Sequence, residues 1–314
     1  MTTTPHTTPR ANPQPAGEPG APGPGATSRR QAPTADTAQV GVSSRARRGA
    51  APWSRGLPIA GAIIALWAVT LVLALRLPVP GGLAAGSGAG GAWLAGAWLE
   101  GAVIVGVVLL RTFLSTGLFI TAHDAMHGVV APGKPRVNAW VGQLALGLYA
   151  LFPFGRLREA HHEHHRYAGT ARDPDFRHED APAGGLGVLR WYGRFVWQYL
   201  SWWQVVGMAA IFNVLVHVAG VPEGRLLLFW VLPSLLSTVQ LFVFGTWLPH
   251  RDDHGSFADG HRARTLAFPT WLSLLTCYHF GYHWEHHAWP HVPWWRLPAA
   301  RRERVGVGQD EAGC

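Results

Sequence analysis

The sequence has few cysteines and few charged residues for its length. Cys277 and Cys314, its two cysteines, are far apart and match no metal-ligand or redox spacing, so a disulfide framework is excluded and a reducing setting is expected. Charged residues make up 14% of the 314 residues, against roughly 25% in soluble globular proteins. Hydrophobic residues make up 48%, and many of the 16 tryptophans lie beside apolar runs. The composition therefore predicts an integral membrane protein.

The charge that is present is mostly positive. The net charge is +8, and the sequence pI is about 10.3. A strongly basic chain can indicate nucleic-acid binding, but here the arginines flank apolar segments, as they do in the cytoplasmic loops of membrane proteins. We therefore expect membrane lipid to surround the chain and no nucleic-acid partner.

The first 52 residues differ in composition from the rest. They are rich in proline, glycine, threonine, alanine and arginine and contain almost no large apolar residues. Such a segment cannot bury enough apolar surface to offset the entropy of ordering, so a disordered tail is predicted over residues 1–52. The first apolar run begins too late for a secretory signal. A single membrane domain is predicted over residues 53–314.

Four segments are apolar enough to cross a hydrocarbon core about 30 Å thick: residues 56–75, 92–122, 195–222 and 226–249. Arg111 lies inside the second, where it should face protein or extend toward the interface. Residues 139–154 are also apolar but of marginal length, so a re-entrant or interfacial hairpin is expected there. The predicted fold is an all-α integral membrane protein with four transmembrane helices, this hairpin and a cytoplasmic helical cap.

The arginines also predict the orientation of the chain. They are frequent in residues 123–194 and after residue 249, whereas the two loops on the other side hold only Arg76 and Arg225 at their edges. By the positive-inside rule, both termini are cytoplasmic and the chain lies in the inner membrane. Every histidine cluster described below then falls on the cytoplasmic side.

Histidine is the enriched residue type, with 17 copies that are mostly clustered. His123 and His127 are four apart at the end of the second crossing, so both can face one metal from one side of a helix. Residues 161–165 and 283–287 each contain His-x-x-His-His. The adjacent pair in each diverges by about 100° on a helix, so its members can reach two different metals. His250 ends the fourth crossing. The candidate metal ligands are His123, His127, His161, His164, His165, His250, His283, His286 and His287.

Neutral imidazole suits iron, zinc, copper and nickel. Nine imidazoles are too many for one ion and enough for two, and the open positions left on two such ions favour redox chemistry with oxygen. No catalytic side chain beyond the metal ligands is predicted. Nearby acids are expected to hydrogen-bond the outer nitrogens of the ligands and fix their tautomers. These acids are Asp124, Glu163, Asp173, Asp175 and Glu285.

The remaining histidines are less informative. His162 offers an alternative register of the second cluster, since His162 and His165 are also three apart. His279 and His291 flank the third cluster and could support it. His217 is expected to be structural. Solvated loop positions are expected for His6, His178, His254 and His261.

These motifs together resemble the membrane fatty-acid desaturase and hydroxylase superfamily, and more closely its bacterial β-carotene ketolases. The residues that carry the resemblance are FITAHDAMHG (119–128), HHEHH (161–165), RDPDF (172–176), FGTWLPHR (244–251), YHFGYHWEHH (278–287) and PHVPWW (290–295). The likeness spans roughly residues 53–300. Tyr167 and Ala288, which follow the second and third clusters, depart from the family pattern, and neither is a metal-ligand type.

The resemblance implies that the nine histidines hold two irons, that O₂ is the oxidant and that a ferredoxin-type protein supplies electrons. It further implies a carotenoid substrate that enters from the bilayer. The reaction would oxidise the C4 methylene of a β-ionone ring to an alcohol, and then through a gem-diol to the ketone. β-Carotene would thus become echinenone and canthaxanthin.

Three other functions remain open from the sequence. A fatty-acyl desaturase or hydroxylase and a β-carotene 3-hydroxylase would use the same metal centre. A transporter that carries metal ions on histidine clusters is a more remote alternative, because transporters place ionisable residues within their crossings and these clusters lie beyond the helix ends.

Overall fold

The computed structural model describes residues 55–76, 90–176, 184–251, 257 and 259–312. All of them belong to one compact unit, Ala51–Cys314. The tail predicted over residues 1–52 lies outside the described residues, as do His6, His178, His254 and Cys314.

The described residues are helical and contain no strand, only an isolated bridge between Thr265 and Tyr282. The all-α prediction is thus confirmed. The α-helices are α1 (Gly56–Arg76), α2 (Gly90–Met126), α3 (Pro135–Ala150), α4 (Phe154–Tyr167), α5 (Gly185–Tyr199), α6 (Trp202–His217), α7 (Glu223–Leu226), α8 (Leu232–Leu241), α9 (Leu248–His250), α10 (Thr270–Cys277), α11 (His283–Ala288) and α12 (Leu297–Ala312). Two π-helical turns, η1 (Leu227–Val231) and η2 (Phe242–Trp247), join α7, α8 and α9, and η3 (Trp294–Arg296) is a short 3-10 helix.

Three helical segments are long and apolar enough to cross a membrane: Gly56–Arg76, Trp98–Met126 and Glu223–His250. Two bent pairs, α3 with α4 (101°) and α5 with α6 (83°), would raise the number to five if each pair were one broken span. Most of residues 139–154, where a hairpin was expected, belongs to the single helix α3, and the bend lies at the end of this range, between α3 and α4.

The third predicted crossing, residues 195–222, is not one continuous helix. The chain leaves the helical conformation at Leu200, and Ser201 starts α6 with a capping box that it shares with Gln204. A helix of 16 residues is about 24 Å long, shorter than the hydrocarbon core, so α6 alone does not meet the length of a straight crossing. The capping residues, which the apolar composition obscured, are the physical reason for the break.

Arg111 is fully buried on α2, among α1 and η1. Its guanidinium donates hydrogen bonds to the carbonyls of Phe229 (3.1 Å) and Trp67, and it lies over the Trp67 ring. Pro233, four residues beyond Phe229, has no N–H to offer that carbonyl. The arginine therefore faces protein, which is one of the two predicted alternatives. It supplies a hydrogen-bond donor to main-chain carbonyls within the apolar part of the helix bundle.

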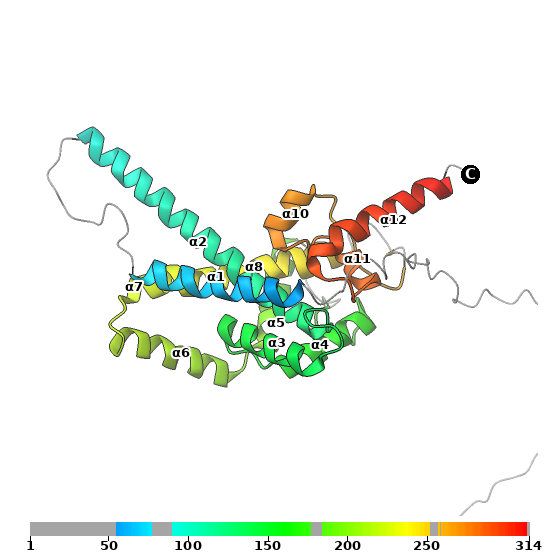
Figure 1. Cartoon of the computed structure of the whole chain (residues 1–314), viewed down its shortest axis with the longest axis horizontal. Coiled ribbons are helices and arrows are strands. Elements are labelled where there is room, and N and C mark those ends of the chain that lie inside the picture. The colour runs from blue at the N-terminus through cyan, green and yellow to red at the C-terminus, as the bar shows by residue number, and fades with distance from the viewer. Residues whose placement is uncertain (1–54, 77–89, 177–183, 252–256, 258, 313–314) are drawn as a thin grey trace, which may run out of the picture. The chain divides into compact units, whose positions relative to one another are not determined.

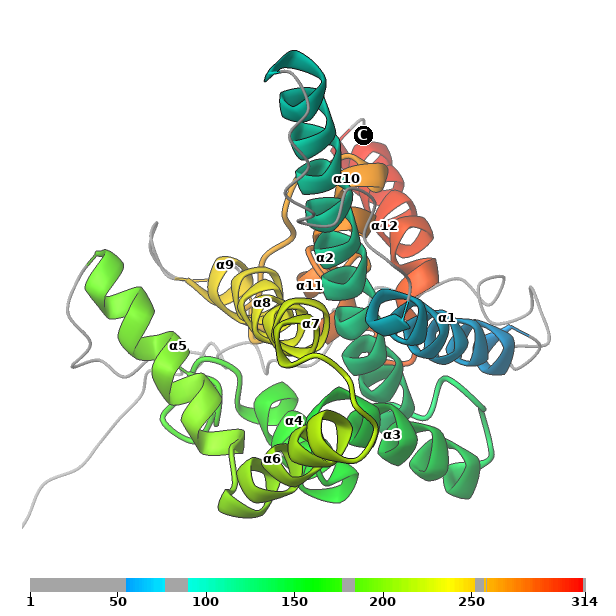
Figure 2. The same cartoon turned by 90° about the vertical axis from the view of Figure 1, so that its left-hand side faces the viewer.

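The helix ends lie at two opposite ends of the bundle. At one end, Arg225 of α7 donates to the carbonyls of Ala74 and Leu75 of α1, both at 3.3 Å. At the other end, Gly56 packs so closely on the main chain of Val130 that any side chain there would overlap it. Figure 1 shows α4 and α11 near the beginning of α1, away from α7. Figure 2, turned by 90°, shows α2 between α1 and α8. The histidine-bearing helices thus gather at one end of the bundle.

Candidate metal centre

The nine histidines predicted as metal ligands lie together in two buried groups. Within each group the nitrogens that could bind an ion are all within 4.8 Å of one another. The first group is His123, His127, His161, His165 and His286, and the second is His164, His250, His283 and His287. Both groups draw on α4 and α11, and α2 and α9 complete them.

The first group converges through its Nε2 atoms. His161 Nε2 lies 2.8 Å from that of His127 and 3.0 Å from that of His165. The Nε2 of His286 lies 2.9 Å from that of His165 and 3.2 Å from that of His123. Two nitrogens bound at right angles to one transition metal, each about 2.1 Å away, are about 3 Å apart. The spacing therefore fits imidazoles arranged around one ion.

The second group is built from the other member of each adjacent pair. His164 and His287 join it, while His165 and His286 belong to the first group. This division follows from helix geometry, because neighbouring side chains diverge by about 100°. His283 and His287 are four apart on α11 and their Nε2 atoms are 3.1 Å apart. The two clusters on α4 and α11 thus each contribute to both groups, as the sequence predicted.

His250 provides an independent test of whether a metal fits. Its Nδ1 donates to the Arg262 carbonyl at 2.7 Å, so the lone pair lies on Nε2. That Nε2 is buried and has no hydrogen-bond partner in the part of the chain that the structure describes. A buried polar atom left unpaired is costly, and a metal ion would satisfy it. The residues present therefore fit a pair of imidazole-bound transition-metal ions.

Most of these histidines are held neutral, as metal binding requires. His164 is the exception, because burial opposes its protonation but its hydrogen bond to Asp173 outweighs burial and raises its pKa. Burial lowers the pKa of His286 and His287, with the neighbouring histidines adding to the effect. Burial likewise lowers the pKa of His127 to about 3. Since a ligand imidazole must be neutral, protons compete weakly for these nitrogens at neutral pH.

Of the acids predicted to orient the ligands, Asp173 makes the clearest contact. Its carboxylate accepts a hydrogen bond from His164 Nδ1 at 2.8 Å and two more from the main-chain N–H groups of Gly169 and Asp175. Asp124 lies 3.6 Å from His123 Nδ1 and accepts from the main-chain N–H of Trp294. Because His164 Nδ1 donates to Asp173, the lone pair of His164 lies on Nε2, which belongs to the second group.

The other three acids lie differently from the prediction. Glu163 is exposed on α4, because it points away from the side that carries His161 and His165, and no described contact joins it to a ligand. Glu285 is fully buried but pairs with Thr265 and Arg304 rather than with a histidine. Asp175 is 3.9 Å from His164 Nδ1, beyond hydrogen-bond distance.

Asp175 instead binds α5. Its carboxylate accepts hydrogen bonds from the Tyr199 hydroxyl at 2.7 Å and from Gln198 Nε2 at 2.9 Å, and its carbonyl accepts from Trp191. Tyr199 is a site residue that sequence reasoning missed. It is 24 residues from Asp175 and belongs to no motif, so only folding brings the two together.

Several histidines stay outside both groups. His162 is exposed, and its Nε2 lies 3.2 Å from the Met126 carbonyl. His291 is exposed, while His279 is buried against Tyr282. None of the three belongs to a group of candidate ligands among the described residues.

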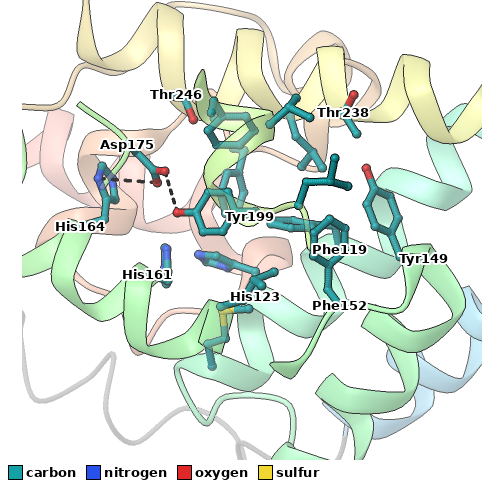
Figure 3. Close-up of a pocket in the computed structure, with 18 of the residues that line it drawn as sticks. Phe119, His123, Tyr149, Phe152, His161, His164, Asp175, Tyr199, Thr238 and Thr246 are labelled. Carbon is teal, nitrogen blue, oxygen red and sulfur yellow. Dashed lines mark hydrogen bonds and ion pairs between the residues drawn. The ribbon is translucent and has the colours of Figure 1, made fainter. Parts of the chain in front are cut away.

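An apolar cavity of about 110 Å³ adjoins both groups. His123 and His161 of the first group and His164 and His283 of the second form part of its wall, and most of the remaining wall is apolar. Figure 3 shows Phe119 and Phe152 on the side of this cavity away from His164. The arrangement can place an apolar molecule beside both histidine groups.

Comparison with known proteins identifies the family of the chain. Residues 97–309 match the family described as fatty acid desaturase. The chain is 52% identical to a beta-carotene ketolase of Paracoccus sp. strain PC1 over 192 residues, 61% of this chain and 76% of that protein. It is 42% identical to a beta-carotene ketolase of Haematococcus lacustris, over 60% of this chain and 59% of that one. A zeaxanthin 4-ketolase of Chlamydomonas reinhardtii is 39% identical over 80% of this chain and 54% of that protein. No solved structure matches.

Proposed function

This chain belongs to the fatty acid desaturase family, and on that premise we propose that it is a carotenoid 4-ketolase. It converts the C4 methylene of a β-ionone ring to a ketone, and so turns β-carotene into echinenone and canthaxanthin. The observation that carries the proposal is the apolar cavity that meets both histidine groups. The ketolase names of the most similar relatives support the substrate class.

The nine histidines would hold two iron ions, five side chains at one and four at the other. When bound, this pair supplies the activation of O₂ and the oxidation of an unactivated C–H bond. The protein's part is to orient the imidazoles, as Asp173 does for His164 and the Arg262 carbonyl does for His250. The apolar wall excludes water from the reacting carbon.

The conversion takes two oxidations. In the first, one atom of O₂ enters a C4–H bond to form an alcohol and the other leaves as water, with two electrons and two protons consumed. The second has the same balance and gives a gem-diol, which loses water to form the ketone. A ferredoxin-type protein supplies the electrons from the cytoplasmic side, and the carotenoid enters from the bilayer of the inner membrane.

Pigment analysis in a bacterial host that accumulates β-carotene tests the proposal. Expression of this chain should convert β-carotene to echinenone and canthaxanthin, with a red shift in absorption. Zeaxanthin in their place would indicate a 3-hydroxylase. Unchanged carotenoid together with altered acyl chains in the host lipids would indicate a desaturase and refute the ketolase.

A further inference from the structure

The cavity beside the histidines is lined by five side chains with a hydroxyl or carboxyl group: Tyr149, Asp175, Tyr199, Thr238 and Thr246. Two of them bind protein groups at the far end of the cavity. The Tyr149 hydroxyl lies 3.2 Å from that of Ser237, and the Thr238 hydroxyl donates to the Leu235 carbonyl and contacts Tyr192. Figure 3 shows Tyr149 and Thr238 well separated from His161 and His164.

Tyr199 lies at the end of the cavity near the histidines. Figure 3 shows its hydroxyl directed at Asp175. The hydroxyl donates its proton to Asp175 Oδ1 at 2.7 Å, and Gln198 holds the same carboxylate at 2.9 Å. Because the proton is engaged, the phenolic oxygen is left with lone pairs and can act only as an acceptor.

The proposed two-step oxidation, on which this inference rests, creates a need for such an acceptor. The hydrocarbon ring has no hydrogen-bonding group, and the ketone has only an acceptor oxygen. Only the two intermediates, the alcohol and the gem-diol that follows it, carry an O–H donor. In an apolar cavity an unpaired hydroxyl is unfavourable, so the alcohol would leave unless the wall offers it a partner.

We propose that Tyr199 accepts a hydrogen bond from the 4-hydroxyl group of the half-oxidised ring and retains it for the second oxidation. Asp175 fixes the phenol in its accepting orientation. The same contact distinguishes the alcohol from the starting ring and from the ketone, since neither of these can donate to it. Tyr199 thus binds the intermediate directly and makes the enzyme a ketolase rather than a 4-hydroxylase, and Asp175 is the positioning residue that acts through it.

The variant Tyr199→Phe, expressed in the β-carotene-accumulating host, tests the proposal. Loss of one hydrogen bond should raise the ratio of 4-hydroxylated to 4-keto products roughly 3- to 10-fold over wild type. The matched control is Tyr192→Phe, which removes a tyrosine hydroxyl from the same helix but outside the cavity wall, and which should keep the wild-type ratio. A merely structural loss would slow both steps and leave the ratio unchanged.

The outcomes separate the inference from the proposed function. If wild type forms ketone and Tyr199→Phe keeps its product ratio, the inference is wrong and the ketolase stands. If Thr246→Val shifts the ratio and Tyr199→Phe does not, the acceptor is misassigned. If wild type forms no oxidised carotenoid, both fail.

A binding measurement covers the case in which Tyr199→Phe makes no product. The full-length protein is purified and kept free of O₂, so that bound carotenoid cannot react. Wild type should bind 4-hydroxy-β-carotene more tightly than β-carotene. In Tyr199→Phe, the ratio of the two affinities should be roughly 3- to 10-fold smaller. A preference that survives the substitution would overturn the proposal.

Discussion

Asp173 and Glu163 show how much the position of a single carboxylate matters. Both are acids close in sequence to ligand histidines, but Asp173 bonds to His164 whereas Glu163 is exposed. Loss of a carboxylate that orients a ligand imidazole typically weakens metal binding about 10- to 100-fold. We therefore expect Asp173→Ala to lose iron at a correspondingly lower chelator concentration, measured as iron retained per purified chain.

Glu163→Gln is the matched control for Asp173→Ala, because Glu163 lies on the same helix as His164 and points elsewhere. It should retain iron like wild type. Equal losses from the two variants would mean that general charge, rather than the hydrogen bond to His164, governs metal retention.

At the scale of elements, the position of α4 depends on a close approach to α3. Gly142 faces the ring of Phe154, the first residue of α4, and a Cβ at Gly142 would overlap that ring. Overpacking of this kind usually costs about 1–3 kcal/mol. Gly142→Ala should therefore lower the thermal midpoint in detergent and, because α4 carries His161, His164 and His165, also reduce the bound iron.

Gly147→Ala serves as the control for Gly142→Ala. Gly147 lies on the same helix, and an added Cβ would meet nothing within 4 Å. Alanine is favoured over glycine inside a helix by up to about 1 kcal/mol, so this variant should be as stable as wild type or slightly more stable. A midpoint that falls equally in both variants would show that α3 tolerates no side chain at either site.

At the scale of the whole molecule, the arginine distribution and the helix ends predict on which side each loop lies. Val218, just after α6, is 80% exposed, and Arg136 is exposed at the start of α3. With Cys314→Ser as background and Cys277 fully buried, Val218→Cys should react with a membrane-impermeant maleimide in intact cells. Arg136→Cys should react only after the cells are opened.

The reverse pattern of labelling would mean that the chain is inserted the other way round. Labelling of both cysteines from one side would show that α6 does not reach the opposite face of the membrane. The reverse pattern would also place the histidine groups away from cytoplasmic electron donors and require a different route for electrons.

The division of the candidate ligands into two groups was determined by the sequence alone, because helix geometry is local. A spacing of four residues brought His123 and His127 into one group, and adjacency separated His164 from His165 and His286 from His287. Apolar length likewise predicted an all-helical membrane fold, whereas the hairpin expected over residues 139–154 is mostly the single helix α3. These properties follow from the rise of 1.5 Å and the rotation of 100° per residue of an α-helix. They do not depend on which helices pack against one another.

The partners of each ligand and the shape of the cavity were decided only by the tertiary structure. Asp173 and Asp175 are two residues apart, but the loop that holds them turns one toward His164 and the other toward Tyr199. Such pairings depend on how separate helices pack, and no spacing along the chain encodes them. The break at Ser201 belongs to the same class, since a capping box within an apolar run redirects the chain and brings α5 and Tyr199 to the wall of the cavity.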